Sequence, residues 1–372
     1  MPVKAPQLVF CRNESVSAGL RRIVDELIKR AIACIKEPST ERDEDLHQVR
    51  LAIKRLRAVL RVLRPVVSKT FFKRENTRLR SAARRLARLR DLAVARRTLE
   101  QVTDKLESHS QEAAVQEVFE AFLAQTPASS HYEEDRETAL RLAARALVQT
   151  RHAFQVLPLP ERGWKIEPGL KKLYRQNRTW MKCASSSDKD EDFHEWRKRV
   201  KYDFYLLKML TPMWPNRLGK TVKCLDCLQD KLGKDHDLAV LKSFLVKHLS
   251  NLGDRTPVGE VVQYLKKWSV KLRKQSIALG KILFEDKPGY WMKALRKRWE
   301  DWQSSQKVRR NLDHGVSAEC RSAVNEVLTD STYRGNARKL QKAIAKANGL
   351  SVAADLIEKS LGVTKKAGAF QV

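Results

Sequence analysis

The sequence lacks the motifs that mark most phosphate-handling enzymes and most membrane proteins. It has no G-x-x-x-x-G-K-[ST] loop, whose backbone N–H groups cradle phosphates in P-loop enzymes, and no E-x-E-x-K signature of the tunnel-type triphosphatases. No apolar run approaches the roughly 18 residues of a membrane-spanning helix. We therefore expect a non-enzymatic protein that needs no cofactor and has no membrane span.

Cysteine is also scarce. Six cysteines among 372 residues show no framework spacing, and the start "MPVKAPQLVF" lacks the apolar core of a signal peptide. We therefore expect an intracellular protein with reduced thiols. "CLDC" at 224–227 is a C-x-x-C pair inside an apolar-periodic helix. Because no second pair exists, we expect it to belong to the core rather than to a redox or metal site.

Negative charge is missing where positive charge is densest. The chain has 74 Lys and Arg against 44 Asp and Glu, a formal charge of +30. Residues 46–97 hold 17 basic residues against Glu75 and Asp91 alone, a net +15, whereas residues 98–140 hold 2 basic and 10 acidic residues, a net −8. Such segregation focuses an electric field in one region. It indicates a polyanionic partner: nucleic acid, an anionic membrane or a phosphate polymer.

The stretch "HQVRLAIKRLRAVLRVLRP" at 47–65 is predicted to be a helix with two stripes. Its apolar residues recur at helical spacing and predict one buried face: Val49, Ile53, Leu56, Leu60 and Leu63. A basic stripe follows one residue later, about 100° further round the helix: His47, Arg50, Lys54, Arg57, Arg61 and Arg64. No carboxylate interrupts this stripe, so its charges repel one another unless an anion binds.

Three landmarks recur in the same order at a nearly constant offset, which indicates a tandem duplication. "GLRRI" at 19–23 returns as "GLKKL" at 169–173, and "HQVRLAIK" at 47–54 returns as "HEWRKRVK" at 194–201. The third pair is "RDLAVARRTL" at 90–99 and "HDLAVLKSFL" at 236–245. Two such copies commonly pack about a pseudo-twofold axis, which would place their basic stripes along one shared channel.

The periodicity is helical throughout, with no alternating β-branched runs. Helices are predicted over 15–36, 44–63, 70–107, 110–125, 131–156, 168–183, 190–210, 215–250, 257–284 and 289–306. We predict an all-α fold of two pseudo-twofold related antiparallel four-helix bundles with a basic central groove. The predicted parts are a first repeat (1–156), a linker (157–167), a second repeat (168–306) and a helical C-terminal extension (307–372).

The paired H-x-x-R-x-x-x-[KR] helices, each followed some 40 residues later by a D-L-x-V segment, resemble the CHAD family, the conserved histidine α-helical domain. The resemblance covers roughly residues 12–306 and implies two four-helix bundles around a basic groove that binds inorganic polyphosphate. The second copy departs from the family pattern, since Phe204, Tyr205 and Lys208 stand where Arg-Tyr and an acidic residue are common. The family contact at 204 is thereby put in doubt, and Lys208 is added as a candidate.

The tail resembles a different group, the C-terminal helices of nucleotide-sugar glycosyltransferases. The likeness rests on "YRGNARKLQKAI" and "AADLIEKSL", and the sheets and loops that such catalysis needs are missing upstream. We assign the tail no activity.

Polyphosphate offers dense charge and no bases to read, so its receptor needs many donors at regular spacing, with Arg as a bidentate fork and Lys as a point charge. The predicted polyphosphate-binding residues are His47, Arg50, Lys54, Arg57, Arg61, Arg78, Arg85, Arg88, Lys171, Arg175, Arg178, His194, Arg197, Lys198, Lys201, Lys208, Lys231, Lys234 and His236. No catalytic or metal-binding residue is predicted.

Some of these positions have a second interpretation. His47 and His194 each have two interpretations. In the first, the protonated side chain binds phosphate; in the second, the side chain has a structural role and forms a hydrogen bond to a neighbouring helix. The stripe from Lys171 suits a solvated helix face equally well, whereas the positions at 78–88 suit one less well. Asp91 and Asp237 are expected to orient basic side chains rather than to act as bases.

Nucleic acid is the alternative partner. Binding of RNA or single-stranded DNA usually adds exposed aromatic rings for stacking. Here Trp180, Trp268, Trp291 and Trp299 fall at amphipathic spacing and are expected in the core, which favours polyphosphate. We expect a monomer that recruits, if anything, a polyphosphate-metabolising enzyme. In a bacterium it would lie on cytoplasmic polyphosphate granules, and in a eukaryote the same charge would suit the nucleus or nucleolus.

Overall fold

The computed structural model describes residues 8–12, 14–37, 42–103, 132–159, 164–249 and 256–315, with a few isolated positions between 326 and 338. The chain forms two compact units, Met1–Ser304 and Ser305–Val372. Within the described ranges every regular element is a helix, so the all-α prediction is confirmed. The predicted helix over 110–125 and the predicted tail helices lie outside the described residues, apart from those isolated positions.

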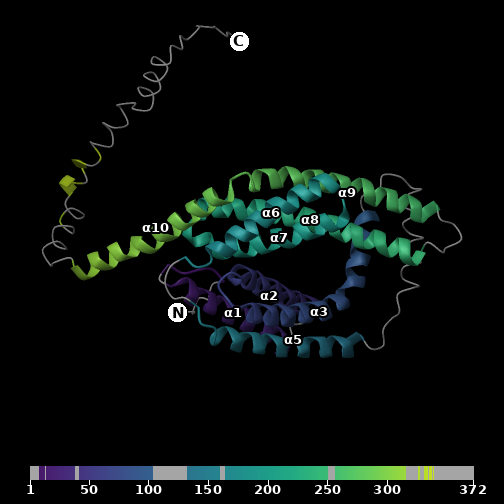
Figure 1. Cartoon of the computed structure of the whole chain (residues 1–372), viewed down its shortest axis with the longest axis horizontal. Coiled ribbons are helices and arrows are strands. Elements are labelled where there is room, and N and C mark those ends of the chain that lie inside the picture. The colour runs from purple at the N-terminus through teal and green to yellow at the C-terminus, as the bar shows by residue number, and fades with distance from the viewer. Residues whose placement is uncertain are drawn as a thin grey trace, which may run out of the picture. The chain divides into compact units, whose positions relative to one another are not determined.

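The helices, labelled as in Figure 1, are α1 (Val16–Lys36), α2 (Arg42–Leu63), α3 (Lys69–Thr103), α5 (Tyr132–Gln155), α6 (Glu167–Ser187), α7 (Asp190–Leu210), a 3₁₀ turn η1 (Thr211–Met213), α8 (Pro215–Leu249), α9 (Thr256–Leu283) and α10 (Pro288–Gly315). They begin and end within a few residues of the predicted limits, except that α10 continues to Gly315. Local chemistry marks several starts: Ser15 Oγ accepts a hydrogen bond from Ala18 N at 3.1 Å, and α8 and α10 open on proline.

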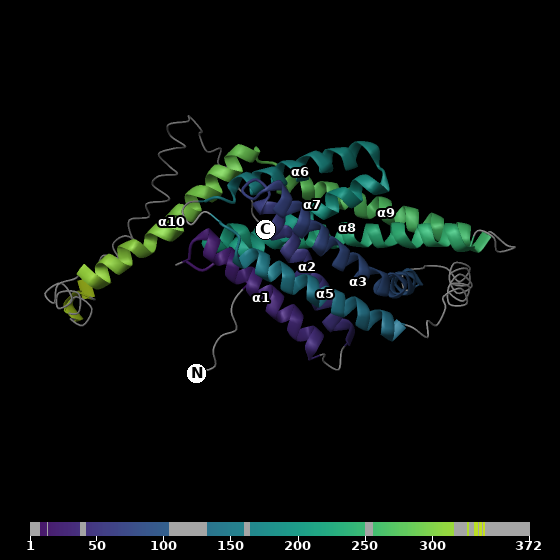
Figure 2. The same cartoon turned by 60° about the horizontal axis from the view of Figure 1, so that its bottom comes forward.

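The helices pack as two groups of four (Figure 1; Figure 2). In the first group α1 contacts α2 and α5, and α3 contacts α2 and α5. In the second group α7 packs between α6 and α8, and α9 contacts α8 and α6. The repeated landmarks lie in corresponding helices, α1 and α6, α2 and α7, α3 and α8. The pseudo-twofold relation between the groups stays a prediction.

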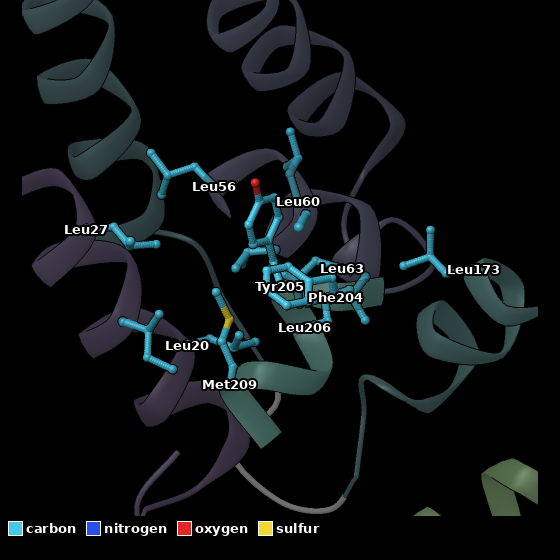
Figure 3. Packing of buried hydrophobic residues seen from close by; sticks show 14 of the residues in the cluster. Leu20, Leu27, Leu56, Leu60, Leu63, Leu173, Phe204, Tyr205, Leu206 and Met209 are labelled. Carbon is cyan, nitrogen blue, oxygen red and sulfur yellow. The ribbon is translucent and has the colours of Figure 1, made fainter. Parts of the chain in front are cut away.

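The two groups are joined through α2, which contacts both α7 and α6, and through α3 against α8. The apolar stripe predicted for α2 is confirmed, because its members from Val49 to Leu63 are at most 2 % exposed. Figure 3 shows α2 leucines meeting Leu20 and Leu27 of α1 and the side chains of Tyr205 and Met209 of α7. Burial of each such side chain contributes about 1.5–3 kcal/mol to folding, so α2 is the central element of this core.

The contact between α2 and α6 is close enough to require glycine. A Cβ on Gly169 would lie 1.8 Å from the carbonyl oxygen of Val62, a backbone atom that cannot move aside cheaply. Gly19 is crowded as well, but by the side chains of Phe10 and Glu14. The two glycines of the repeated "GL" pair therefore both mark places where another segment crosses the start of a helix.

Candidate functional site

The basic stripe of α2 borders a cavity between four helices. The cavity has a volume of about 300 Å³. We call it the basic pocket, and its lining residues are Arg50, Lys54 and Arg57 of α2, Ala87 of α3, His194, Arg197, Lys198, Lys201, Tyr202 and Tyr205 of α7, and His236, Asp237 and Val240 of α8. Cations from two helices some 140 residues apart in the chain thus converge on one space.

The electrostatic environment of the pocket disfavours its own positive charge. Burial lowers the pKa of the Arg57 guanidinium, and the nearby charges of Arg61 and Arg80 lower it further. The Nε atom of Arg57 is buried with no hydrogen-bond partner among the described residues. An unsatisfied buried donor of this kind costs about 1–3 kcal/mol, and an anion in the pocket would relieve both the desolvation and the repulsion.

Two histidines meet inside the pocket. His194 Nδ1 of α7 lies 3.1 Å from His236 Nδ1 of α8, with ring centroids 4.4 Å apart. At this distance one ring must donate and the other accept, so the unprotonated pair holds one shared hydrogen bond. Burial, followed by the charges of Arg197 and other cations, lowers the pKa of His236 to about 3. The pKa of His194 is lowered for the same reasons.

An ion-pair network fixes the helices that carry these histidines. Arg273 of α9 is almost fully buried, and its Nε donates to Asp235 Oδ1 at 3.0 Å, one residue before His236. The same guanidinium pairs with Asp190 in the first turn of α7 and with Asp188 at 3.2 Å. Burial lowers the pKa of Arg273, but these acidic partners outweigh burial and raise it. Arg273 therefore ties α7, α8 and α9 together beside the pocket.

The two basic helices are compensated differently. On α7, Glu195 pairs with both Lys198 and Arg199 and so neutralises part of the local charge. The described part of α2 carries its acidic residues only in the first turn, at Asp43, Glu44 and Asp45. The pocket-lining cations of α2 lie further along the helix, at Arg50, Lys54 and Arg57.

The other described residues of the first copy that were predicted to bind polyphosphate are not among those that line the basic pocket. His47 and Arg85 are exposed, and the side chain of Arg88 lies outside the described residues. Arg78 pairs with the buried Glu75 at 2.5 Å. Arg61 places its guanidinium 5.4 Å and 5.6 Å from the ring centroids of Phe72 and Tyr202.

The predicted residues on α6 and the later part of the second copy are also placed elsewhere. Arg178 donates to the carbonyl oxygens of Phe284, Glu285 and Asp286, and so binds the chain where it leaves α9. Lys208 lies 5.5 Å from the Phe204 ring centroid, and Lys231 donates to Gln275 Oε1 at 2.7 Å. The others outside the pocket lining are Lys171, Arg175 and Lys234.

The sequence interpretation missed two aromatic lining residues, Tyr202 and Tyr205. They follow Lys198 and Lys201 by one helical turn, so continuing the basic stripe at i+4 would have found them. Burial raises the pKa of the Tyr205 hydroxyl, and the guanidinium of Arg55 lies 6.0 Å from its ring centroid.

The "CLDC" prediction needs a correction. Leu225 and Leu228 face the core, but Cys227 is exposed and Cys224 is partly exposed, both as free thiols. The helix therefore turns its cysteines toward the margin of the core. Within the described residues no group of three His, Cys, Asp or Glu side chains is placed to hold a metal ion. The described helices also include none that is long and apolar enough to cross a membrane.

Comparison with known proteins places this geometry in context. The family model described as "CHAD domain" matches residues 20–246, more than half of the chain. The structure is similar to the crystal structure of the CHAD domain from the plant Ricinus communis, with a TM-score of 0.53 and 15% sequence identity, covering 77% of this chain and 97% of that chain. At that identity the likeness shows the fold alone. A search of curated proteins gives no match.

Proposed function

The chain belongs to the CHAD family, and on that premise we propose that it binds inorganic polyphosphate in the basic pocket without catalysing a reaction on it. One observation carries the proposal. Arg50, Lys54 and Arg57 of α2 line the same cavity as Arg197, Lys198 and Lys201 of α7. Because these cations repel one another in a partly buried space, an anion bound between them would stabilise the arrangement.

The shape and charge of the site suit a polymer rather than a single phosphate. Residues seven apart on a helix lie about 10.5 Å apart along its axis, so Arg50 and Arg57 contact positions several phosphates apart on an extended chain. Residues 46–97, which include the α2 side of the pocket, carry a net charge of +15, and such a charge would steer a long polyanion toward it. Location on polyphosphate granules would follow from such binding.

The lining chemistry supports binding rather than turnover. Phosphoryl-transfer sites commonly hold Mg²⁺ through carboxylates. Asp237 is the one carboxylate among the described lining residues, and it faces six Lys and Arg side chains. Its proposed role is to orient those cations.

Nucleic acid is the competing ligand, and Tyr202 and Tyr205 are the lining rings on which a base would have to stack. Tyr205 is buried, and the Arg61 guanidinium already lies 5.6 Å from the Tyr202 centroid. Stacking of a base would therefore require Tyr205 to become exposed or the Arg61 guanidinium to move from Tyr202. The pocket therefore favours a ligand without bases.

Calorimetry at about 150 mM salt tests the proposal. Long-chain polyphosphate is compared with RNA and single-stranded DNA of equal charge, on the wild type and on Arg50→Glu/Lys54→Glu/Arg57→Glu. We expect the triple variant to lose about 100-fold or more in polyphosphate affinity. The matched control is Lys267→Glu/Lys271→Glu/Lys274→Glu, which makes the same charge change at exposed α9 positions outside the pocket.

The control variant should keep its affinity within about threefold. Equal losses in both variants would mean that binding follows net charge alone and would overturn the assignment of the site. Nucleic-acid binding as tight as polyphosphate binding would overturn the assignment of the ligand.

A further inference from the structure

A second cavity lies within the second helix group, and the function proposed above does not use it. It has a volume of about 360 Å³ and is lined by residues of α6, α7, α8 and α10, by the end of α9 and by the residues that follow α9. We call it the apolar pocket. Buried side chains such as Leu170, Leu207 and Leu295 form much of its wall. Pockets of this size and lining, with a few convergent polar groups, are where small molecules usually bind.

Aromatic rings form one side of the apolar pocket. Tyr174 lies 5.6 Å from Phe284 and 6.2 Å from Trp291, measured between ring centroids. All three residues line the cavity. The Tyr174 hydroxyl donates to the carbonyl oxygen of Asp286 at 3.0 Å, which holds its ring in place. Such rings present apolar faces with negative π density, which attract organic cations.

A carboxyl group, Asp203, also lines this cavity. The residue is 4 % exposed, and its Oδ2 accepts a hydrogen bond from Asn177 Nδ2 at 2.5 Å. Among the described residues, this is the only hydrogen bond to Asp203, and none of their cations lies beside the carboxyl group. The Asn177 Oδ1 atom is buried without a hydrogen-bond partner among the described residues. Burial raises the pKa of Asp203 to about 7. A cation in the cavity would supply the partner that this carboxylate lacks.

The rim carries charges of both signs, and they partly cancel. Arg217 pairs with Asp286 at 3.7 Å, with its guanidinium 6.0 Å from the Trp291 centroid. Lys220 and Glu285 complete the charged rim, and both are exposed. An anionic ligand that entered past this rim would meet the Asp203 carboxyl, whereas an ammonium ion would meet a complementary group.

We propose that the apolar pocket binds a small organic ammonium ion, with the ammonium group against the Asp203 carboxylate and the apolar body against Tyr174, Phe284 and Trp291. The site is separate from the basic pocket and does not depend on polyphosphate binding. In this pose the carboxylate supplies a charge-assisted hydrogen bond to the ammonium group, and the three aromatic residues supply an apolar surface for the rest of the ligand.

Three probes of similar shape test the charge preference: benzylammonium, benzyl alcohol and benzoate, titrated calorimetrically into the full chain at pH 7.5. We expect benzylammonium to bind at least about tenfold more tightly than benzyl alcohol, with benzoate weakest. In Asp203→Asn, which keeps the shape of the side chain, the first two probes should bind within about twofold of each other. Equal binding of all three probes, a retained preference in Asp203→Asn, or no binding of benzylammonium would overturn the proposal.

The cysteines provide a test of location that needs no variant. Cys224 lines the apolar pocket, while Cys227 is exposed and is not among the lining residues. Saturating benzylammonium should slow the alkylation of Cys224 by iodoacetamide at least about fivefold and leave Cys227 unchanged, as read by peptide mapping. Unchanged alkylation of Cys224, or equal slowing at both thiols, would mean that the ammonium ion binds elsewhere and would overturn the site.

Discussion

The basic pocket and the apolar pocket share two helices and differ in almost everything else. Helix α7 sends His194, Arg197 and Lys201 into the basic pocket, and Asp203 and Leu207 into the apolar pocket. Helix α8 likewise contributes to both. Each pocket contains a titratable group that burial pushes toward its neutral form. In the basic pocket this group is His236, with a pKa of about 3, and in the apolar pocket it is Asp203, with a pKa of about 7.

The same physical cause thus has opposite consequences for the ligand. Desolvation disfavours whichever charge a side chain would carry, so a buried histidine among cations is relieved by an anion and a buried carboxyl is relieved by a cation. The two proposed ligands therefore have opposite charges, although α7 lines both pockets. The predictions below test this contrast.

The largest expected effect comes from the packing of α7, a helix that lines both pockets. Trp196 on α7 is fully buried, and its ring packs so tightly on Gly280 of α9 that a Cβ there would lie 2.6 Å from Trp196 Cζ2. Trp196→Ala should lower the free energy of unfolding by about 3–5 kcal/mol, because it leaves a large cavity. Urea denaturation followed by circular dichroism measures the change. The control Tyr290→Ala, at a site 69% exposed, should change it by less than about 0.5 kcal/mol.

The next effect separates the pockets by pH. His236 has a pKa of about 3 when folded against the ordinary 6.5, so the unfolded chain binds the proton more readily. Its contribution to stability is complete above about pH 6.5 and is lost as the pH falls toward 3. The free energy of unfolding of the wild type minus that of His236→Gln should therefore fall by about 1 kcal/mol per unit from pH 6.5 to 5. A difference that is constant with pH would contradict the burial of a neutral imidazole.

Asp203 should give the opposite slope. Its pKa of about 7 when folded lies above the ordinary 3.8, so the folded chain holds the proton more tightly than the unfolded chain does. This contribution is complete below about pH 3.8 and is lost as the pH rises to 7. The free energy of unfolding of the wild type minus that of Asp203→Asn should fall by about 1 kcal/mol per unit as the pH rises from 5 to 7. Slopes of the same sign for both variants would refute the contrast between the pockets.

The smallest effect is expected at His47. It occupies the motif position that corresponds to His194, yet it is exposed and does not line the basic pocket. His47→Gln should change polyphosphate affinity by less than about twofold, because exposed charges are screened at physiological salt. His194→Gln should change it more. A larger loss from His47→Gln than from His194→Gln would mean that the polymer follows the outer surface of α2 instead of the pocket.

Most of the fold could be predicted from the sequence, because helix limits are local properties. The apolar stripe of α2 and the proline residues that begin α8 and α10 depend only on residues close by in the sequence. The predicted repeat relates α2 to α7, and these two helices supply the six Lys and Arg side chains that line the basic pocket.

The rest of the site depends on contacts between residues that are far apart in the sequence. Arg178 suited a basic stripe on α6, but the chain after α9 returns to it and its guanidinium binds three carbonyl oxygens there. His194 and His47 share a motif position, and only the packing of α8 decides that one of them meets another histidine. Nothing in the sequence indicates that Asp203 is buried, because a single acidic residue in a helix is usually exposed.

The glycine at 169 has a consequence for how this protein can evolve. Most surface and even core positions tolerate several amino acids, so a lineage can drift through them by small steps. Position 169 offers no such path, because the first added carbon would overlap the main-chain oxygen of Val62. Replacing this glycine would require α6 to move away from α2, so substitutions that keep the two helix groups in this contact must leave position 169 unchanged.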